Sequence, residues 1–479
     1  MDQQELQVML PYMVLAAASI VVILLIAFKR SHTVIQVSGF LMLCGVIAAM
    51  WGVRGLLPLE VPPLFVVDGF GALFTGLIIF SVLVIGLLSF IYFEEREENP
   101  KEYYILLFLS TLGAATLTIS RHFISFFIGL ELLTVSLYAL IAYLRNRNNA
   151  IEAGMKYLVL AALSSAFLLF GMALIYMETG SMEFTAIALK PERSSLLFTT
   201  GIGLMAVAIG FKLALVPFHL WAADVYQGAP PPVTALIATV SKIGVFSVLL
   251  RFGQAIPLDE GSLGYTIFSA LAILSMVAGN FLALQQQNLK RLLAYSSIAH
   301  FGYLMVAFLP GDNSGVEAAV FYLMAYSVTV LAAFGMITVM SSRERDAELL
   351  DAYRGLFWRR PLVAAVLTVA MLSLAGIPLT AGFIGKFLVL TTGVRVQQWL
   401  PVVALVLTSV LGVYYYLRVI SVLFGEAPAG LAVSKEKVLH PFFYFATFAS
   451  LLALTFMLLY MGIFPGSVIN GIRLFLLFG

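Results

Sequence analysis

Residues 211–234 read FKLALVPFHLWAADVYQGAPPPVT, and this stretch decides how the rest of the chain is interpreted. It begins inside a long apolar run, yet Lys212, Pro217 and His219 lie within a few residues of one another. A proline inside a helix removes the hydrogen bond to the carbonyl four residues earlier, here that of Leu213. In a membrane, a backbone group freed in this way must be satisfied by protein or by a water-filled cavity. The stretch therefore predicts a transmembrane helix that is broken beside a buried lysine.

The composition of the whole chain agrees with a membrane location. Of 479 residues, 61% are hydrophobic and 11% are charged, and the mean hydropathy is +1.01. Soluble domains have about 25% charged residues, so we expect an integral membrane protein. The net charge of +2 and the lack of a basic run argue against a nucleic-acid partner. No Cys or His cluster has metal-ligand spacing, so we expect no metal, haem or iron–sulfur site in this chain.

The apolar segments predict an all-α, polytopic fold that forms one integral membrane domain, residues 1–479. A spanning helix needs about 20 mainly apolar residues, and this criterion gives about 14 transmembrane helices. The predicted spans are 9–28, 33–52, 68–93, 103–120, 122–144, 150–177, 195–217, 231–252, 262–285, 291–310, 315–341, 361–392, 399–424 and 440–464.

The loop charges predict the orientation of the chain. Lys and Arg predominate in the loops that this set of spans puts on the cytoplasmic side, and that asymmetry places both termini on the opposite side. The N-terminus is acidic and lacks the basic region of a cleaved signal peptide. The polar segment 341–360 is interpreted either as a short amphipathic cytoplasmic helix or as a plain charged connector.

Two parts of the chain are weakly similar to each other. The seventh span ends in LALVPFHLW and the twelfth contains LSLAGIPLTAGFIGKFLVL, so each has a late proline, Pro217 or Pro378, near a lysine. These spans belong to two units, 103–252 and 262–424, which each hold five predicted helices. Because an odd number of helices reverses direction, we expect two inverted five-helix repeats with discontinuous helices 7 and 12, as is common in transporters.

Charged residues inside spans are costly, by about 2.5–3.5 kcal/mol each, and usually mark function. Glu131 lies about 15 Å into the fifth span at 1.5 Å rise per residue. Lys156, near the start of the sixth span, is interpreted either as the buried ion-pair partner of Glu131 or as a side chain that snorkels to the headgroups. Glu131 could alternatively be a structural acid bonded to a neighbouring helix.

Further protonatable side chains continue this pattern along the chain. Lys212 and Lys386 lie in the two broken spans, and Lys242 is central in the eighth. His300 lies in the tenth span and His219 follows the first break; each is interpreted either as a proton relay or as a structural hydrogen bonder. Together these residues predict a hydrated proton path through the middle of the protein.

The long motif FKLALVPFHLWAADVYQGAPPPVTALIATVSKIGVF resembles the signature of the antiporter-like membrane subunits of respiratory complex I. NLKRLLAYSSIAHFGY and LAGIPLTAGFIGKF match two further segments of that family, and the resemblance spans roughly 60–424. Ala222 and Ala223 stand where the family often has a proline before the aspartate, and Pro231 is an additional proline.

The resemblance implies a membrane subunit of a translocase that moves protons during electron transfer from NADH to quinone. It implies that Glu131 and Lys156 form a modulating pair, that Lys212 is the central, Lys242 the connecting and Lys386 the exit-side lysine, and that His219 and His300 are intermediates. This chain would perform no redox chemistry and bind no cofactor.

The resemblance also implies partners and a location. NAD(H), FMN, iron–sulfur clusters and quinone would bind to partner subunits. Those partners would be neighbouring antiporter-like and small membrane subunits and the peripheral redox arm, within the lipid of a bacterial cytoplasmic (inner) membrane.

Other functions stay open at this point. A subunit of a multisubunit sodium/proton antiporter, or of a related membrane-bound hydrogenase or dehydrogenase complex, would share the fold and the lysines. A self-sufficient solute transporter and a structural subunit with vestigial charges are the remaining alternatives.

Overall fold

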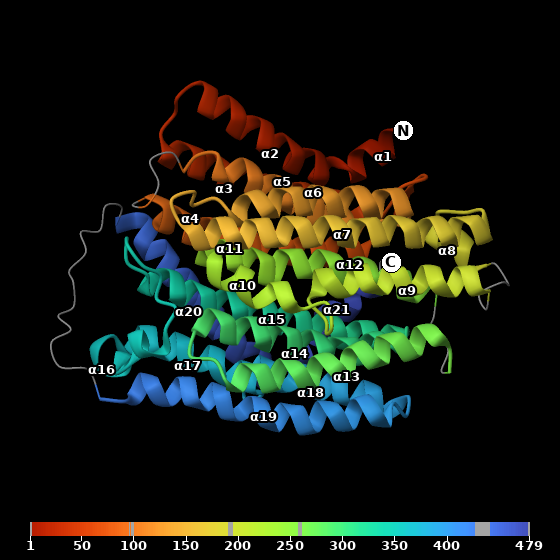
Figure 1. Cartoon of the computed structure of the whole chain (residues 1–479). Coiled ribbons are helices and arrows are strands. Elements are labelled where there is room, and N and C mark those ends of the chain that lie inside the picture. The colour runs from red at the N-terminus through yellow and green to blue at the C-terminus, as the bar shows by residue number, and fades with distance from the viewer. Residues whose placement is uncertain are drawn as a thin grey trace.

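The computed structural model describes residues 2–94, 96, 100–189, 195–256, 261–426 and 441–477. The first residue of the predicted span 440–464 lies outside this described part. The fold is an elongated bundle whose long helices run side by side (Figure 1). The predicted class, an all-α polytopic membrane protein, is confirmed.

The N-terminal half contains the first of the two helix breaks. Its elements are α1 (Gln3–Val8), α2 (Leu10–Ala27), α3 (His32–Val53), η1 (Arg54–Leu56), β1 (Leu59–Val61), β2 (Phe65–Val67), α4 (Gly69–Glu94), α5 (Tyr103–Thr118), α6 (Phe123–Ile141), α7 (Asn148–Thr179), α8 (Phe184–Ala188), α9 (Leu196–Leu213), α10 (Leu220–Gly228), α11 (Pro231–Leu236), the π-helical turn Ile237–Ser241 and α12 (Lys242–Ala255).

The C-terminal half contains the second break. Its elements are α13 (Leu263–Leu284), α14 (Leu289–Phe308), α15 (Asn313–Met340), η3 (Leu350–Tyr353), α16 (Leu356–Arg359), α17 (Pro361–Ala375), α18 (Ala381–Arg395), α19 (Trp399–Phe424), α20 (Pro441–Ile463) and α21 (Pro465–Leu477). In the described part of the chain, 11 helices are long and apolar enough to cross a membrane. The number of crossings and the repeat arrangement stay predictions.

Both predicted breaks are present, but the first differs from its prediction. The helix α9 ends at Leu213, four residues before Pro217, because Ala214 adopts a left-handed conformation (φ 60°) that closes the helix. The chain then forms a second half-helix, α10, in a segment that lies outside the predicted spans. Pro378 likewise lies between α17, which ends at the left-handed Gly376 (φ 80°), and α18.

The segment 341–360 is neither of the two predicted forms. It contains two short helical turns, η3 and α16, which are separated by Gly355 in the left-handed conformation. Leu350, Tyr353 and Leu356 are buried, whereas Leu349 is exposed. A continuous amphipathic helix cannot form here because Gly355 reverses the local backbone.

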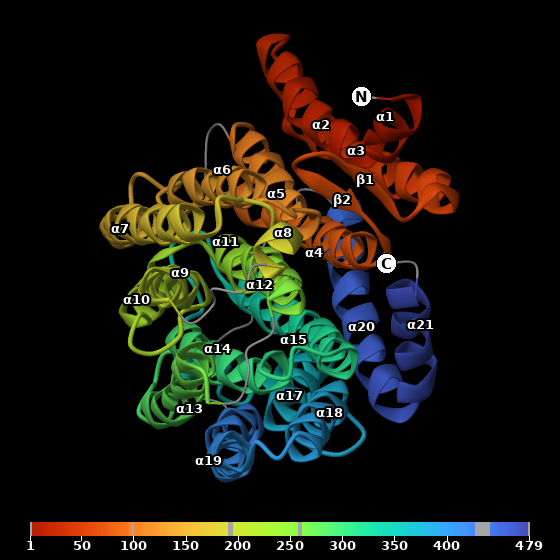
Figure 2. The ribbon, with the colours of Figure 1, turned by 90° about the vertical axis from the view of Figure 1, so that its right-hand side faces the viewer.

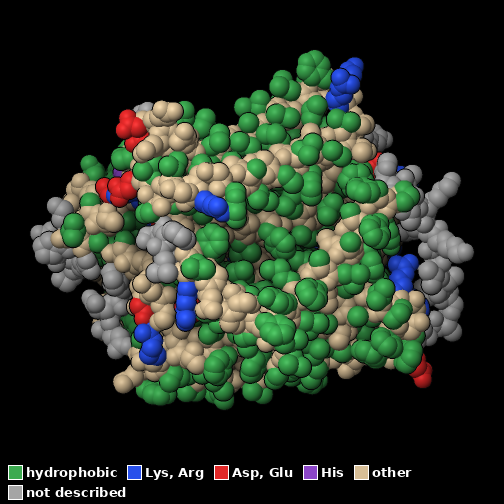
Figure 3. All heavy atoms as spheres, turned by 180° about the vertical axis from the view of Figure 1, so that it is seen from behind, with side chains coloured by type: hydrophobic (Ala, Val, Ile, Leu, Met, Phe, Trp, Pro, Cys, Tyr) green, Lys and Arg blue, Asp and Glu red, His purple; other side chains and the backbone are tan. Residues whose placement is uncertain are grey.

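The exposed surface and the interior are both apolar, as expected for a protein surrounded by lipid. On the face seen in Figure 3, green hydrophobic side chains cover the middle, and most of the charged side chains lie toward the two ends. Seen along the helices, α1–α3 project from one side of the bundle, and α20 and α21 lie along another (Figure 2).

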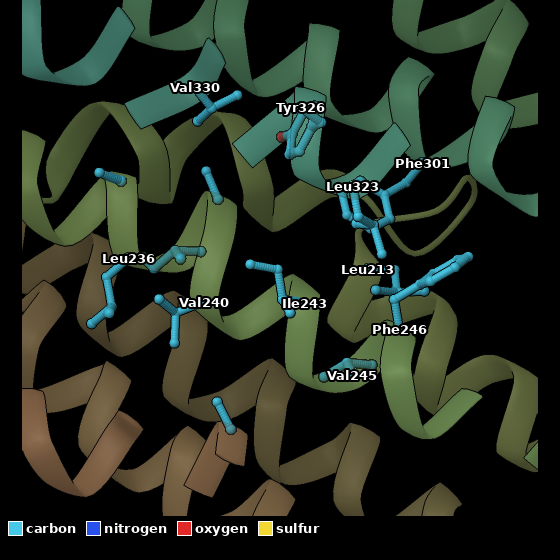
Figure 4. Packing of buried hydrophobic residues seen from close by; sticks show 14 of the residues in the cluster. Leu213, Leu236, Val240, Ile243, Val245, Phe246, Phe301, Leu323, Tyr326 and Val330 are labelled. Atoms are coloured by element: carbon cyan, nitrogen blue, oxygen red, sulfur yellow. The ribbon is translucent and has the colours of Figure 1, made fainter. Parts of the chain in front are cut away.

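The two most deeply enclosed spans form the centre of the bundle. The apolar 18-residue stretch within Pro231–Ala255 is completely buried, and 94% of the corresponding stretch within Asn313–Met340 is buried. Figure 4 shows Leu213, Phe246, Phe301 and Leu323 meeting where α9, α12, α14 and α15 come together. The buried lysines described next emerge from this packed apolar core.

Candidate functional site

The first buried cation, Lys212, is held by α6. Its Nζ donates to the Thr134 hydroxyl at 2.6 Å, and the ammonium lies 5.7 Å from the Tyr157 ring. Glu131, one turn before Thr134, accepts a hydrogen bond from Ser165 on α7 and attracts the Lys212 ammonium. A carboxylate, a hydroxyl and a buried ammonium are thus brought together between α6, α7 and α9.

The second buried cation, Lys242, caps the first break. Its Nζ donates to the Leu213 carbonyl at 3.0 Å and to the Ser297 hydroxyl at 2.7 Å, and it lies 4.4 Å from the Phe301 ring. We expected Lys212 itself to lie beside the freed Leu213 carbonyl, and that was wrong. Lys212 binds Thr134 on α6 instead, and it is Lys242 that binds the carbonyl at the end of α9.

The central histidine joins two tyrosines. His300 is buried; its Nδ1 lies 2.7 Å from the Tyr322 hydroxyl and its Nε2 lies 3.0 Å from the Tyr416 hydroxyl. The Tyr416 hydroxyl also bonds to Ser296, one turn before His300. A neutral imidazole donates through one nitrogen and accepts through the other, so this arrangement can pass a proton between α15 and α19.

The third buried cation, Lys386, caps the second break from within its own broken helix. Its Nζ donates to the Leu374 carbonyl at 2.9 Å and to the Ala375 carbonyl at 3.0 Å, and it lies 5.4 Å from the Tyr303 ring. The sequence suggested the same setting as for Lys212. The settings differ because Lys386 belongs to the half-helix after the break and reaches back.

The direct Glu131–Lys156 pair expected from the sequence is not formed. Lys156 is exposed, and its Nζ lies 2.8 Å from both the Glu152 and the Asp224 carboxylates. Asp224 lies in α10 and also binds Arg291 at 2.8 Å. The i,i+4 pair with Glu152 and the pair with Asp224 hold Lys156 beside an open cavity of about 170 Å³, which agrees with the second interpretation, a side chain that reaches toward the membrane surface.

His219 stands apart from the buried lysines. It is the N-terminal cap residue of α10, half buried, and its Nδ1 atom is buried without a hydrogen-bond partner among the described residues. Within the described part of the chain, no hydrogen bond or ion pair connects it to Lys212. Its role as a relay stays a prediction.

Several polar residues of the site were missed by sequence reasoning. Hydroxyl groups at helix positions give no hydrophobicity signal, and only the fold shows which of them meet a lysine or the histidine. The missed residues are Thr134, Ser165, Ser297, Tyr226, Tyr322, Tyr326 and Tyr416. The i, i+4, i+7 pattern of Ser296, His300 and Tyr303 was the one available signal.

A large polar cavity lies at one end of the bundle, on the side predicted as cytoplasmic. It has a volume of about 730 Å³ and is lined by residues of the α6–α7 loop, the end of α10 and the α15–η3 loop, including Arg147, Gln227 and Asp346. Burial would raise the pKa of the Asp346 carboxyl, but the charge of Lys290 and the Tyr92 hydroxyl outweigh it and lower that pKa.

In the described part of the chain, no group of three His, Cys, Asp or Glu side chains is placed to hold a metal ion. The groups that are assembled are protonatable side chains and hydroxyls. The chemistry that this arrangement can support is proton transfer.

Comparison with known proteins identifies a family. Residues 120–412 match the family described as NADH:quinone oxidoreductase/Mrp antiporter, transmembrane. The chain is similar to subunit N of the NADH-quinone oxidoreductase of Ectopseudomonas mendocina (strain ymp), with 49% identity over 89% of this chain and 88% of that protein. It is similar to the subunit of the same name from Methylococcus capsulatus (strain ATCC 33009 / NCIMB 11132 / Bath), with 44% identity over 98% and 95% of the two chains.

A solved structure agrees with these matches. A chain of respiratory complex I from Thermus thermophilus, determined with bound aureothin, superposes with a TM-score of 0.82 and 34% identity. The superposition covers 96% of this chain and 98% of that one.

Proposed function

The chain belongs to the NADH:quinone oxidoreductase/Mrp antiporter transmembrane family, and from this premise we propose that it works as the proton-translocating, antiporter-like subunit N of an NADH-quinone oxidoreductase. Relatives with that name share 44% to 49% of its sequence over most of its length. Within the family, this favours the NADH-quinone oxidoreductase over a sodium/proton antiporter.

One observation carries the proposal: protonatable groups follow one another across the apolar centre of the bundle. Lys212 binds Thr134 on α6, one turn from Glu131, and Lys242 links the end of α9 to α14. His300 joins α15 to α19, and Lys386 holds the end of α17. Lys212, Lys242 and Lys386 are buried, at 3%, 1% and 9% exposure. Buried ionisable groups in a membrane protein are costly and are retained for ion or proton pathways.

The reaction is shared with the rest of the complex. The chain is a membrane subunit of a translocase, and electron transfer from NADH to quinone takes place in partner subunits that hold NAD(H), FMN, iron–sulfur clusters and quinone. The residues of this chain take up, pass on and release protons. Lys156 and His219 would act at the ends of the path, since they lie outside the buried series.

The location follows from the same premise. The protein is a multi-pass membrane protein, and it works beside other membrane subunits and a peripheral arm. A bacterial cytoplasmic membrane, with both chain termini on the non-cytoplasmic side, agrees with the distribution of Lys and Arg in the loops.

We also propose that residues 103–252 and 262–424 are inverted five-helix repeats. In support, α9 and α10 form the fourth long element after α5, α6 and α7, and α17 and α18 form the fourth after α13, α14 and α15. Each broken element ends its first half with a left-handed residue, Ala214 or Gly376.

The experiment measures NADH-driven proton pumping in membrane vesicles that contain the complex with Lys212→Ala. We expect pumping to fall at least about 10²-fold, as for loss of a proton-transfer group, with quinone reduction falling alongside it where coupling is tight. Lys29→Ala, at an exposed position, is the matched control and should leave both rates unchanged. Normal pumping in the Lys212→Ala complex would contradict the proposed role. Transport that requires sodium would instead support the antiporter alternative.

A further inference from the structure

A second charged cluster lies outside the proton-transfer series, at the predicted cytoplasmic end of the bundle. Its centre is Asp346, in the loop between α15 and η3, whose side chain is only 10% exposed. The Asp346 Oδ1 atom accepts from the Tyr92 hydroxyl at 2.7 Å and lies 3.2 Å from Arg147 Nη1. Its other oxygen lies 3.4 Å from Lys290 Nζ. One carboxylate thus joins α4, the α6–α7 loop and α14.

Lys290 extends this cluster to the first broken helix. Its side chain is completely buried, and its Nζ donates to the Gln227 carbonyl at 2.8 Å and to the Ala229 carbonyl at 2.7 Å. These carbonyls belong to the C-terminal end of α10, where backbone acceptors lack partners within the helix and a positive charge is favourable. Asp346 is the carboxylate that lies within 4 Å of this buried ammonium, and Glu348 acts on it from farther away.

Tyr226, near the C-terminal end of α10, contacts a residue that binds Lys242. Tyr226 precedes Gln227, and its hydroxyl lies 3.5 Å from the Ser297 hydroxyl. Ser297 is the residue that accepts from Lys242 at 2.7 Å. The position of the α10 terminus therefore sets how Tyr226 lies beside Ser297, and through Ser297 it affects the environment of Lys242.

The loop that supplies Asp346 is itself fixed to the turn between α13 and α14. The Leu289 amide donates to the Glu348 carbonyl at 2.6 Å, and the Leu350 amide donates to the Gln287 carbonyl at 3.0 Å. The carboxylate is thus presented from a fixed backbone rather than from a free loop.

We propose that Asp346 is a positioning residue: by holding Lys290 against the end of half-helix α10, it keeps Tyr226 and Ser297 in register for proton transfer at Lys242. This inference rests on the proposed function. It links the second half of the chain to the broken helix of the first half, and it assigns no proton-carrying step to Asp346 itself.

The experiment compares Asp346→Asn with Asp351→Asn in vesicles that contain the whole complex. Asp351 is an exposed carboxylate in the same segment, so its loss controls for a change of loop charge. We expect pumping per assembled complex to fall about tenfold in Asp346→Asn, since misplacement by about 1 Å can cost up to about 10²-fold. Asp351→Asn should pump normally. A purely structural role would lower the amount of assembled complex and leave pumping per complex unchanged.

A double variant tests whether Asp346 acts through Lys290. Lys290→Met should lower pumping by a similar factor, and Asp346→Asn added to Lys290→Met should lower it no further, because residues in one network are not additive. A multiplied loss in the double variant would overturn the proposal. Hydrogen exchange of the α10 amides should be faster in Asp346→Asn and unchanged in Asp351→Asn.

Two further measurements complete the test. The pH profile of pumping between pH 6 and 8 should keep its shape in Asp346→Asn, and a shifted profile would mean that Asp346 carries protons and does not position Lys290. If Asp346→Asn fails to assemble, Asp346→Glu decides: the retained charge should restore assembly while pumping stays below normal, and normal pumping would refute the positioning role. In the same vesicles, Lys242→Ala without effect would point to failure of the proposed function instead.

Discussion

The two helix breaks are closed by lysines in different ways. At the first break, Lys242 comes from another helix, α12, and binds the Leu213 carbonyl. At the second break, Lys386 comes from the same broken helix and binds the Leu374 and Ala375 carbonyls. Lys212, which belongs to the first broken helix, binds no break carbonyl and turns to Thr134 instead. The same backbone requirement is therefore met by a neighbouring helix in one half and locally in the other.

The two breaks are therefore expected to respond differently when neighbouring helices move. A lysine on another helix couples the first break to the packing of α12, so a shift of α12 would expose the Leu213 carbonyl. The second break carries its own capping cation and can move as a unit with α18. The first break is the more dependent of the two on its surroundings.

Replacing each lysine by methionine gives the largest expected effects. It also separates the role of the lysine in proton transfer from its role in binding the carbonyls at a helix break. Lys212→Met, Lys242→Met and Lys386→Met should each lower NADH-driven pumping about 10²-fold or more, since each removes a proton-transfer group. Lys242→Met should also speed hydrogen exchange at residues 214–219, and Lys386→Met at residues 376–380, because buried carbonyls lose their donors.

Lys212→Met is the matched control in this set. It removes a buried charge without freeing a break carbonyl, so exchange at both breaks should stay as in the unmodified protein. Unchanged exchange at residues 214–219 in the Lys242→Met protein would show that Lys242 does not close the first break.

The left-handed residues at the breaks predict the next largest effect. A Cβ on Gly376 would lie 2.9 Å from Lys386 Cδ, and Gly376 has a φ of 80°. Gly376→Ala should therefore lower the free energy of unfolding by about 2 kcal/mol, from backbone strain of about 1–2 kcal/mol plus crowding. Thermal unfolding of the purified complex measures this loss.

Ala214→Gly is the counterpart at the first break. It relieves strain at a φ of 60° but removes a buried methyl group, so the two contributions nearly cancel to within about 1 kcal/mol. Equal losses of unfolding free energy in Gly376→Ala and Ala214→Gly would contradict the view that only the second break needs space for its own lysine.

Hydroxyl groups near each break give a smaller effect. Thr134 accepts from the charged Lys212 at 2.6 Å, whereas Thr329 bonds to the neutral Ser373 hydroxyl at 3.0 Å. Hydrogen bonds to charged groups contribute about 1.5–3 kcal/mol and neutral ones about 0.5–1.5 kcal/mol. Thr134→Val should therefore slow pumping about tenfold and Thr329→Val about threefold. A larger loss in Thr329→Val would reverse the assignment of the more sensitive half.

The sequence allowed the prediction of the charged residues of the proton-transfer series but not of their partners, and it did not predict the burial of Lys290. Glu131, Lys212, Lys242 and Lys386 stand out because a charge in an apolar run is costly. Their partners are hydroxyls and backbone carbonyls, which occur throughout any membrane helix and carry no signal of their own. Of the two interpretations of Lys156, the pair with Glu131 was wrong, because the exposed Lys156 finds the Glu152 and Asp224 carboxylates near the start of its own helix.

The fold was predictable to the same extent. Long apolar runs identify most helices, because each must cover its backbone in lipid. The half-helix α10 was missed because it contains Asp224 and follows a proline, and these are features of a turn as well. Its helical form is supported by contacts outside the segment itself: Arg291, 67 residues away, pairs with Asp224, and the Trp221 indole donates to the Phe211 carbonyl in α9 at 2.9 Å.

The smallest predicted effect concerns the far end of the second half-helix, α18. There Arg395 pairs with Asp312, which also caps α15 by accepting from the Gly315 amide at 2.8 Å. These side chains are 52% and 37% exposed, so the pair should contribute no more than about 1 kcal/mol. Asp312→Asn keeps a capping side chain and loses only the charge, whereas Asp312→Ala loses both and should cost about 1 kcal/mol more.

The pH dependence of this effect has a definite sign. Burial would raise the pKa of Asp312, but Arg395 and the Gly315 amide outweigh it and lower that pKa below its usual value. A carboxylate with a lowered pKa stabilises the folded protein fully above the unfolded-state value of about 4, and this stabilisation fades as the pH falls through the folded-state value. The melting-temperature difference between Asp312→Asn and the unmodified complex should thus be constant from pH 7 to 5 and shrink at lower pH. A difference that changes between pH 7 and 5 would mean that another group titrates with the pair. The end of α10 is held by the buried Asp346 and Lys290, and the end of α18 by this exposed pair. A larger fall in the melting temperature of the complex in Asp346→Asn than in Asp312→Asn is therefore expected if the first half-helix is the more tightly fixed.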